Sequence, residues 1–375
     1  MRVLNPFIIV GYEGPQYFCD RKNETERLIN AIENGRNVTL ISLRRMGKTG
    51  LIRHVFHKLK RKKNSVCIYV DMMPTNDLDS FVKKFGFSLF SGSALLTSKA
   101  LKTISGFFSN LKLTISYDSI SGSPSISAIP TGEDDLFNTV DEIFKYISNQ
   151  NENFVIAFDE FQQAMNYKEQ NLIAHLRSNI QNTGNANFIF SGSQKHTLLS
   201  MFTSHNQPFY QSTEIMDLQS IQKNEYADFI QKNFYNGNIL INDETIDYLL
   251  DKTNTHTYFV QYICNKLYSL QLKNIDKQNI DEIFSRILRE NETIYYNYRK
   301  LLSNNQWNLL TAIAKEKGID KPTSNYFISK YNLGQASSVA LSLKNLEEKE
   351  IIYADNQGCY NVADIFLSAW LIKNA

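Results

Sequence analysis

The sequence predicts a parallel α/β fold with helices on both faces of one sheet. Five short apolar runs, at 38–41, 66–70, 154–158, 188–190 and 214–218, are separated by helical patterns, and this alternation is typical of parallel sheets. The run at 154–158 is almost continuously apolar, as expected of a strand that is buried on both faces. Ligands of such sheets bind beyond the carboxyl ends of the strands. The residues that follow each run are therefore the candidates for function.

The residues after the first run fit a phosphate-binding loop. The stretch LISLRRMGKTGLIRHVF (40–56) predicts a strand, a polar turn and a helix, which is the context that the pattern G-x-x-x-x-G-K-[S/T] needs. Gly47, Lys48 and Thr49 match the end of this pattern, whereas Ser42 stands where its first glycine is expected. The alternative is a lysine at the start of an ordinary helix. The loop is favoured because the second half of a phosphate site follows later in the chain.

This loop predicts ATP and Mg²⁺ as ligands. The N-terminus of a helix attracts phosphate, Lys48 can reach the β- and γ-phosphates, and the Thr49 hydroxyl can ligate Mg²⁺. The predicted nucleotide-binding residues of the loop are Arg44, Arg45, Met46, Gly47, Lys48, Thr49 and Gly50.

Two acidic residues complete the predicted site. Asp159 and Glu160 directly follow the apolar run at 154–158. Asp159 is placed to hold Mg²⁺ together with Thr49, and Glu160 is placed to polarise the attacking water. Lys48 and Glu160 are thus the predicted catalytic residues. Ser191, at the end of the next run, is predicted to touch the γ-phosphate, with a plain Ser-Gly turn as the alternative.

Composition argues against several other classes of protein. The formal net charge of +2 does not demand nucleic acid or a membrane surface as a partner. The four cysteines are scattered without a C-x-x-C pair, which argues against zinc and against a disulfide framework and fits a reducing cytoplasm. No apolar window approaches the length of a transmembrane helix, and the apolar N-terminal run is too short for a signal peptide. We therefore expect a cytoplasmic protein.

With these motifs in view, the chain resembles the archaeal-type ATPase family, a branch of the STAND and AAA+ P-loop ATPases that also occurs in bacteria, and we expect a bacterial member. The resemblance rests on RRMGKT at 44–49, FDEFQ at 158–162, FSGSQ at 190–194 and FCDRKNE at 18–24. It implies that Asp20 and Arg21 lie near the adenine. It also implies a core sheet of order 5-1-4-3-2, a helical lid and a C-terminal winged helix.

The expected domains are an ATPase domain at 1–222, a lid at 223–290 and a winged helix at 291–375. An insertion at about 81–135 contains an amphipathic helical stretch and then alternating strands around a Ser-Gly-Ser-Pro turn. This insertion is either a docking element for a partner or a flap on the core. The lid pattern is helical throughout.

The chain departs from the family in three places. Besides Ser42, the stretch PFYQST at 208–213 lacks the arginine expected near the γ-phosphate. Arg44, Arg45 and Arg177 are possible substitutes, although Arg177 is better explained as a surface residue. In the lid, Thr257 stands where the family has proline. His256 beside it is better explained as a helix-start residue than as a ligand.

Three functions remain open at this stage. The first is a Mg²⁺-dependent ATPase that acts as a conformational switch, with an unknown protein partner, possible self-association and slow turnover when alone. The second is an ATP-dependent DNA-binding protein. From Lys300 onward, however, the sequence contains eight lysines, no arginine and seven acidic residues, so its charges nearly balance. A DNA-reading module usually has a basic face. The third is a nucleotide-binding scaffold that scarcely hydrolyses ATP.

Overall fold

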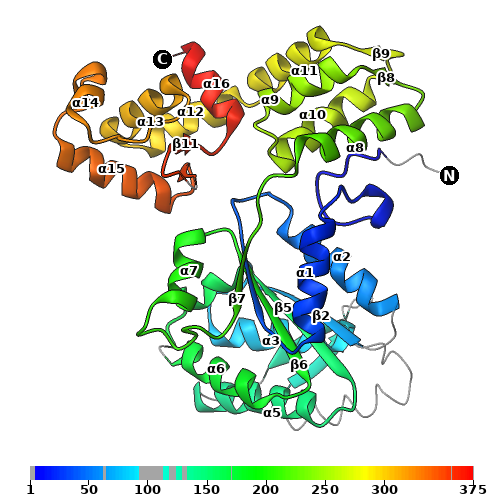
Figure 1. Cartoon of the computed structure of the whole chain (residues 1–375). Coiled ribbons are helices and arrows are strands. Elements are labelled where there is room, and N and C mark those ends of the chain that lie inside the picture. The colour runs from blue at the N-terminus through cyan, green and yellow to red at the C-terminus, as the bar shows by residue number, and fades with distance from the viewer. Residues whose placement is uncertain are drawn as a thin grey trace. The chain divides into compact units, whose positions relative to one another are not determined.

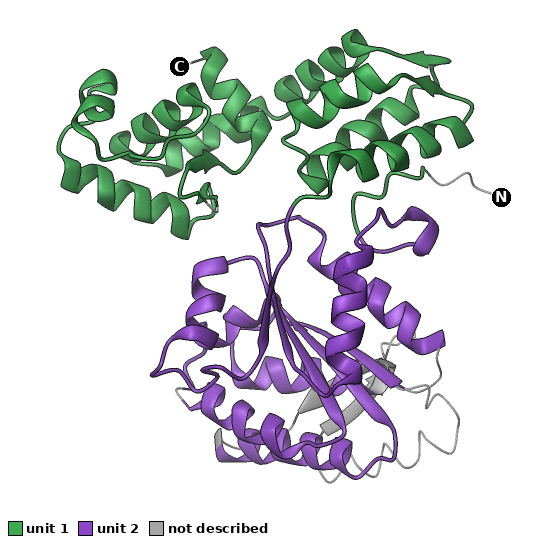
Figure 2. Ribbon diagram, viewed as in Figure 1, with its two compact units in different colours: residues 1–10, 220–375 green, residues 11–219 purple. Residues whose placement is uncertain are grey.

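The computed structural model describes residues 5–61, 65–92, 113–117, 124–128, 133–169, 171–355 and 357–374. They form two compact units, coloured separately in Figure 2. Residues 11–219 make the α/β unit, and the described residues before 11 join those from 220 onward in a helical unit. The domain limits at 222 and 290 stay a prediction.

The first unit is built on a parallel five-stranded sheet (Figure 1). Its strands are β1 (Val38–Ile41), β2 (Ser65–Asp71), β5 (Asn153–Asp159), β6 (Ala186–Gly192) and β7 (Glu214–Asp217). Their order is β2-β5-β6-β1-β7. If these five strands alone are numbered 1 to 5 along the chain and the sheet is read from β7, the order is 5-1-4-3-2. The predicted order is therefore confirmed. The register aligns Asp71, Asp159 and Ser191 across three strands, so the ends predicted to carry function lie along one edge.

Helices cover both faces of this sheet. The face of α1 (Lys22–Glu33) and α2 (Lys48–Arg61) buries Val155 and Ala157 of β5. The opposite face buries Phe154, Ile156 and Phe158 under the remaining helices of the unit. These are α3 (Leu78–Gly92), α5 (Glu133–Ser148), α6 (Leu172–Asn182) and α7 (Lys195–Thr203). Side chains alternate between the two faces of a strand. The run at 154–158 is continuously apolar because both faces of β5 are covered.

Part of the expected insertion lies among the described residues. Strands β3 (Leu113–Tyr117) and β4 (Pro124–Ala128) form an antiparallel pair, so the two predicted alternating strands are confirmed. The amphipathic stretch before them lies, apart from residues 91 and 92 at the end of α3, outside the described residues, as do residues 118–123 between the strands. Its role stays open between docking element and flap.

The helical unit contains the expected lid and winged helix. Its lid helices are α8 (Lys223–Asn236), α9 (Asp243–Lys252), α10 (Thr257–Ser269) and α11 (Lys277–Glu290). The prediction of a wholly helical pattern is wrong at one point, because β8 (Leu240–Ile241) and β9 (Asn274–Ile275) form a short parallel pair. Two residues are too short a run for periodicity to reveal a strand. Phe7, near the start of the chain, is fully buried here beside Phe229 and Phe234.

The predicted winged helix is confirmed. Helix α12 (Glu292–Leu301) leads into α13 (Asn304–Glu316), α14 (Asn325–Tyr331) and α15 (Ala336–Glu348). The hairpin of β10 (Ile352–Ala354) and β11 (Tyr360–Val362) follows, and α16 (Ile365–Asn374) closes the unit. The sequence predicted neither α12 nor α16. Among the described residues, no helix is both long and apolar enough to cross a bilayer.

Candidate active site

The loop between β1 and α2, which is predicted to bind phosphate, contains two residues with positive φ. Gly47 has a φ of 96° and Arg45 one of 62°, so two residues of the turn take the left-handed conformation. Ser42 is not among the residues with positive φ. A serine therefore replaces the expected first glycine without backbone strain, because a side chain is disfavoured only where φ is positive.

Lys48 is held inside this loop. Its side chain is 6% exposed, and its Nζ donates to the Ser42 Oγ at 3.1 Å, the Leu43 carbonyl at 3.3 Å and the Ser42 carbonyl at 3.4 Å. A buried ammonium group is tolerated only with such acceptors. The Ser42 hydroxyl thus does what no glycine could do, since it offers Lys48 a side-chain oxygen.

Asp159 is the centre of the site. Asp159 is 4% exposed. Its Oδ2 accepts a hydrogen bond from the Thr49 hydroxyl at 2.7 Å and another from the Tyr69 hydroxyl. Its Oδ1 accepts from the Ser191 hydroxyl at 2.5 Å and from the Glu160 N–H at 3.2 Å. The loop and the two predicted strand ends therefore meet at one carboxylate. The Ser191 hydroxyl points to Asp159, and its contact with a nucleotide stays a prediction.

Glu160 is held by the chain that follows β6. Its backbone is left-handed, with a φ of 57°, and its Oε2 accepts from the N–H and the hydroxyl of Ser193, both at 3.1 Å. The Gln162 amide donates to the same oxygen at 2.5 Å. Three donors thus fix the carboxylate next to Asp159, where a general base is expected.

Of the two residues predicted near the adenine, Arg21 makes contacts that support the fold. Asp20 and Arg21 both have positive φ. The buried Arg21 guanidinium donates to the carbonyls of Met46 and Gln219 and pairs with Glu24 at 2.9 Å. It therefore ties the loop between β1 and α2 to the last residue of the α/β unit.

The aromatic side chains around α2 form a cluster close to the loop. A Cβ on Gly50 would lie 3.5 Å from the Phe18 ring, and Phe18 stacks on His54 with ring centroids 4.3 Å apart. The Tyr12 hydroxyl hydrogen-bonds the His54 Nδ1 at 2.9 Å. Burial, with help from the charges of Lys58 and His57, lowers the pKa of His54 to about 4.

The other residues singled out from the sequence differ in their surroundings. Arg44 and Arg45 are exposed, whereas Met46 is buried. Arg177 lies on α6, where it donates to Gln181 at 2.9 Å. His256 and Thr257 belong to the helical unit, and the His256 ring packs on Phe259 with centroids 4.5 Å apart. Any role of these two residues in nucleotide binding stays a prediction.

Sequence reasoning missed three residues of the site, Tyr69, Gln162 and Ser193. Tyr69 lies two residues before the end of β2 and pairs with Ala157 of β5, so its reach to Asp159 depends on which strand adjoins β5. Gln162 and Ser193 lie within FDEFQ and FSGSQ. Their polar side chains just past strand ends were the signal that could have revealed them.

The sequence model of one protein family, described as an ATPase domain predominantly from Archaea, matches residues 18–249. This chain belongs to that family. A second family model, for a probable winged helix domain, matches residues 293–373. Family and fold together support ATP hydrolysis in general, and the resemblance stated from the motifs is confirmed at the level of the family.

Solved structures share the fold along nearly the whole chain. The Walker-type ATPase of Pyrococcus abyssi is similar with a TM-score of 0.68 and 16% identity, covering 98% of this chain and 99% of that one. The ORC2 protein of Aeropyrum pernix has a TM-score of 0.61 at 13% identity, with 98% and 96% covered. The ORC1 protein of the same organism, solved in complex with DNA, has a TM-score of 0.52 at 10% identity, with 96% and 94% covered. The curated proteins contain no match.

Proposed function

We propose that the protein is a Mg²⁺-dependent ATPase that acts as a nucleotide-driven conformational switch. The observation that carries the proposal is the meeting of the phosphate loop with the acidic strand end, since the Thr49 hydroxyl lies 2.7 Å from the Asp159 Oδ2. Lys48 and Glu160 flank this pair at the same edge of the sheet. This is the set of groups that phosphoryl transfer from ATP needs.

The residues fit the expected ligands. A hydroxyl and a carboxylate are oxygen donors, which Mg²⁺ prefers, and α2 presents its N-terminus to a phosphate. Thr49 and Asp159 would hold the ion, and Lys48 would contact the β- and γ-phosphates. The metal would neutralise charge on the phosphates. Glu160, already oriented by Ser193 and Gln162, would accept a proton from the attacking water.

Arg21 supports the switch. Its guanidinium bonds both the Met46 carbonyl in the phosphate loop and the Gln219 carbonyl. Gln219 is the last residue before the chain enters the helical unit. A movement of the loop on nucleotide binding or hydrolysis would therefore act on the connection between the units through one side chain. The contact links the loop to the segment that leads into the helical unit, and a switch needs such a physical link.

The experiment is calorimetric titration of ATP with Mg²⁺, followed by measurement of phosphate release. Lys48→Ala should weaken ATP binding by at least tenfold, because a charge-assisted contact is worth about 1.5–3 kcal/mol. Lys58→Ala, an exposed lysine on the same helix, is the matched control and should bind normally. Glu160→Gln should bind ATP but stop phosphate release, since an amide cannot accept the proton. Unchanged affinity in Lys48→Ala would contradict the proposed site.

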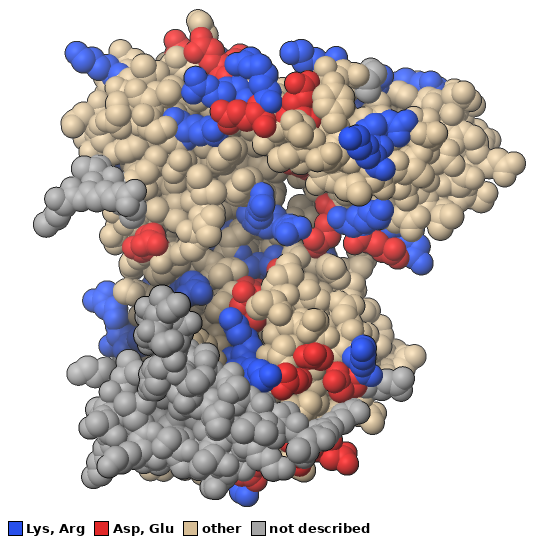
Figure 3. Space-filling view, turned by 180° about the vertical axis from the view of Figure 1, so that it is seen from behind, with Lys and Arg blue, Asp and Glu red and all other residues tan. Residues whose placement is uncertain are grey.

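DNA binding is the second candidate. The observation in its favour is the winged helix together with the fold shared with an ORC1 protein solved on DNA. Against it, Lys330 pairs with Glu316 at 2.6 Å and Lys344 lies 3.8 Å from Glu348. Figure 3 shows basic side chains next to acidic ones on the face that it draws. We therefore rank it below the switch.

A further inference from the structure

We infer that Tyr69 is a positioning residue of the magnesium site, whose hydroxyl fixes the orientation of the Asp159 carboxylate and so sets the affinity for Mg²⁺. The inference rests on the proposed function and names a residue of the same site that neither the motifs nor the family assign.

The hydrogen bonds of Asp159 carry the inference. Each oxygen of the Asp159 carboxylate accepts two hydrogen bonds. Tyr69 and Thr49 share Oδ2, while Ser191 and the Glu160 N–H share Oδ1. These bonds hold the carboxylate in one orientation, and a turn would break them in a buried setting. Tyr69 is the one donor of the four for which no role toward ATP or Mg²⁺ was predicted.

The ring of Tyr69 is itself held in place. The Arg53 guanidinium lies 4.5 Å from the ring centroid, in the geometry of a cation–π contact. Arg53 follows Thr49 by one helical turn of α2. The same helix therefore supplies the predicted metal ligand and the guanidinium that contacts the Tyr69 ring. A phenol is protonated at neutral pH, so its hydroxyl can donate to Asp159.

Such a donor matters because Mg²⁺ demands near-ideal octahedral geometry. Hydrogen bonds to metal-binding carboxylates orient them, and their loss typically costs about 10–100-fold in metal affinity or activity. The Tyr69 hydroxyl shares one oxygen with Thr49, the other predicted ligand. Removing it leaves that oxygen with a single fixed donor.

The test compares wild type with Tyr69→Phe in titrations of ATP at increasing Mg²⁺ concentration and in EDTA. We expect the Mg²⁺ concentration for half-maximal enhancement of ATP binding to rise about tenfold. The affinity for ATP in EDTA should stay as in wild type, because no phosphate contact is removed. A merely structural role would change both values or lower the Tm. Tyr167→Phe is the matched control, since this tyrosine lies in the same unit and its hydroxyl bonds Thr75 instead of Asp159.

A second variant guards against a folding defect. Arg53→Gln changes an exposed residue and should shift the Mg²⁺ response in the same direction by a smaller factor. An unchanged or tighter Mg²⁺ response in Tyr69→Phe would overturn the inference while leaving the proposed function standing. If Tyr69→Phe does not fold, an unchanged response in Arg53→Gln overturns it instead. Wild type that binds ATP without any Mg²⁺ dependence would refute the proposed function, and the inference with it.

Discussion

Single residues decide the chemistry of this site through the partners they find. Ser42 keeps an ordinary backbone conformation and gives Lys48 an acceptor at 3.1 Å. The departure from the usual loop pattern is therefore compensated in the structure. Glu160 depends in the same way on Ser193, which supplies two of its three hydrogen bonds.

His54 leads to a prediction about acid stability. Its pKa of about 4 lies below the ordinary value of 6.5, so the unfolded chain takes up the proton first as the pH falls. Stability should be constant above about pH 6.5 and should decrease between about pH 6.5 and 4. Thermal melts across this range, with the histidine ring followed by NMR, check the prediction. His54→Gln should lose this part of the pH dependence, and a ring that titrates near 6.5 would contradict it.

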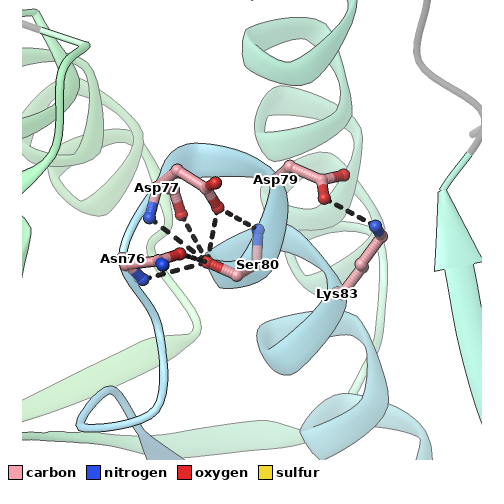
Figure 4. A network of polar contacts seen from close by, with 5 residues as sticks. All are labelled: Asn76, Asp77, Asp79, Ser80 and Lys83. Carbon is pink, nitrogen blue, oxygen red and sulfur yellow. Dashed lines mark hydrogen bonds and ion pairs between the residues drawn. The ribbon is translucent and has the colours of Figure 1, made fainter.

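At the scale of elements, α3 shows how a helix start is secured at the functional edge (Figure 4). The Asp77 Oδ1 accepts from the Ser80 N–H at 2.8 Å, while the Asp77 N–H donates to the Ser80 Oγ at 3.2 Å. This is the reciprocal arrangement of a capping box. Just before it, the Met72 N–H donates to the Asp159 carbonyl at 2.9 Å. The segment between β2 and α3 is thus connected to the strand that carries the site.

Asp77→Ala should therefore lower the free energy of unfolding by about 1 kcal/mol, the usual contribution of an N-cap. Asp79→Ala, which removes the half-exposed pair with Lys83 and leaves the cap in place, should cost less, at about 0.3–0.5 kcal/mol. Hydrogen bonds from Ser80 lower the pKa of Asp77. The contribution of the cap is hence present above the ordinary carboxyl pKa and disappears as the pH falls through the lowered one. Urea denaturation at neutral and acidic pH measures both effects, and equal losses in the two variants would contradict the cap.

At the scale of the whole molecule, the charge distribution predicts weak binding to DNA. Phosphate neutralisation supplies most non-specific affinity, and the winged helix is close to neutral. The full chain should bind labelled duplex DNA no more tightly than a Kd of about 10⁻⁶ M at physiological salt, with or without ATP. Fluorescence anisotropy tests this. Tight binding that weakens steeply with salt would instead favour the DNA-binding alternative.

The whole chain should also turn over slowly when alone. The stretch at 208–213 contains no arginine, and Arg177 is engaged with Gln181 on α6. Because an arginine finger contributes roughly 10³–10⁵ in rate, we expect turnover on the order of one per minute or less. Phosphate release measured over a range of protein concentrations checks this. Several turnovers per second, independent of concentration, would show a complete site within one chain.

Local patterns of the sequence predicted the strands of the core and singled out Lys48, Thr49, Asp159 and Glu160. The order of the strands came from the family resemblance. Each of these strands and residues is encoded within one strand and the turn that follows it, where periodicity and residue type suffice. The three central helices and the hairpin of the winged helix could be predicted for the same reason, whereas α12 and α16 were not predicted.

Only the tertiary structure decided which side chains surround the two carboxylates. Tyr69 reaches Asp159 because β2 adjoins β5 in a register that pairs Asp71 with Asp159. Ser193 reaches Glu160 because β6 lies on the other side of β5. Phe7 likewise packs among residues beyond 220. These contacts join segments far apart in the chain, and their geometry follows from strand neighbours and register, which a local pattern does not contain.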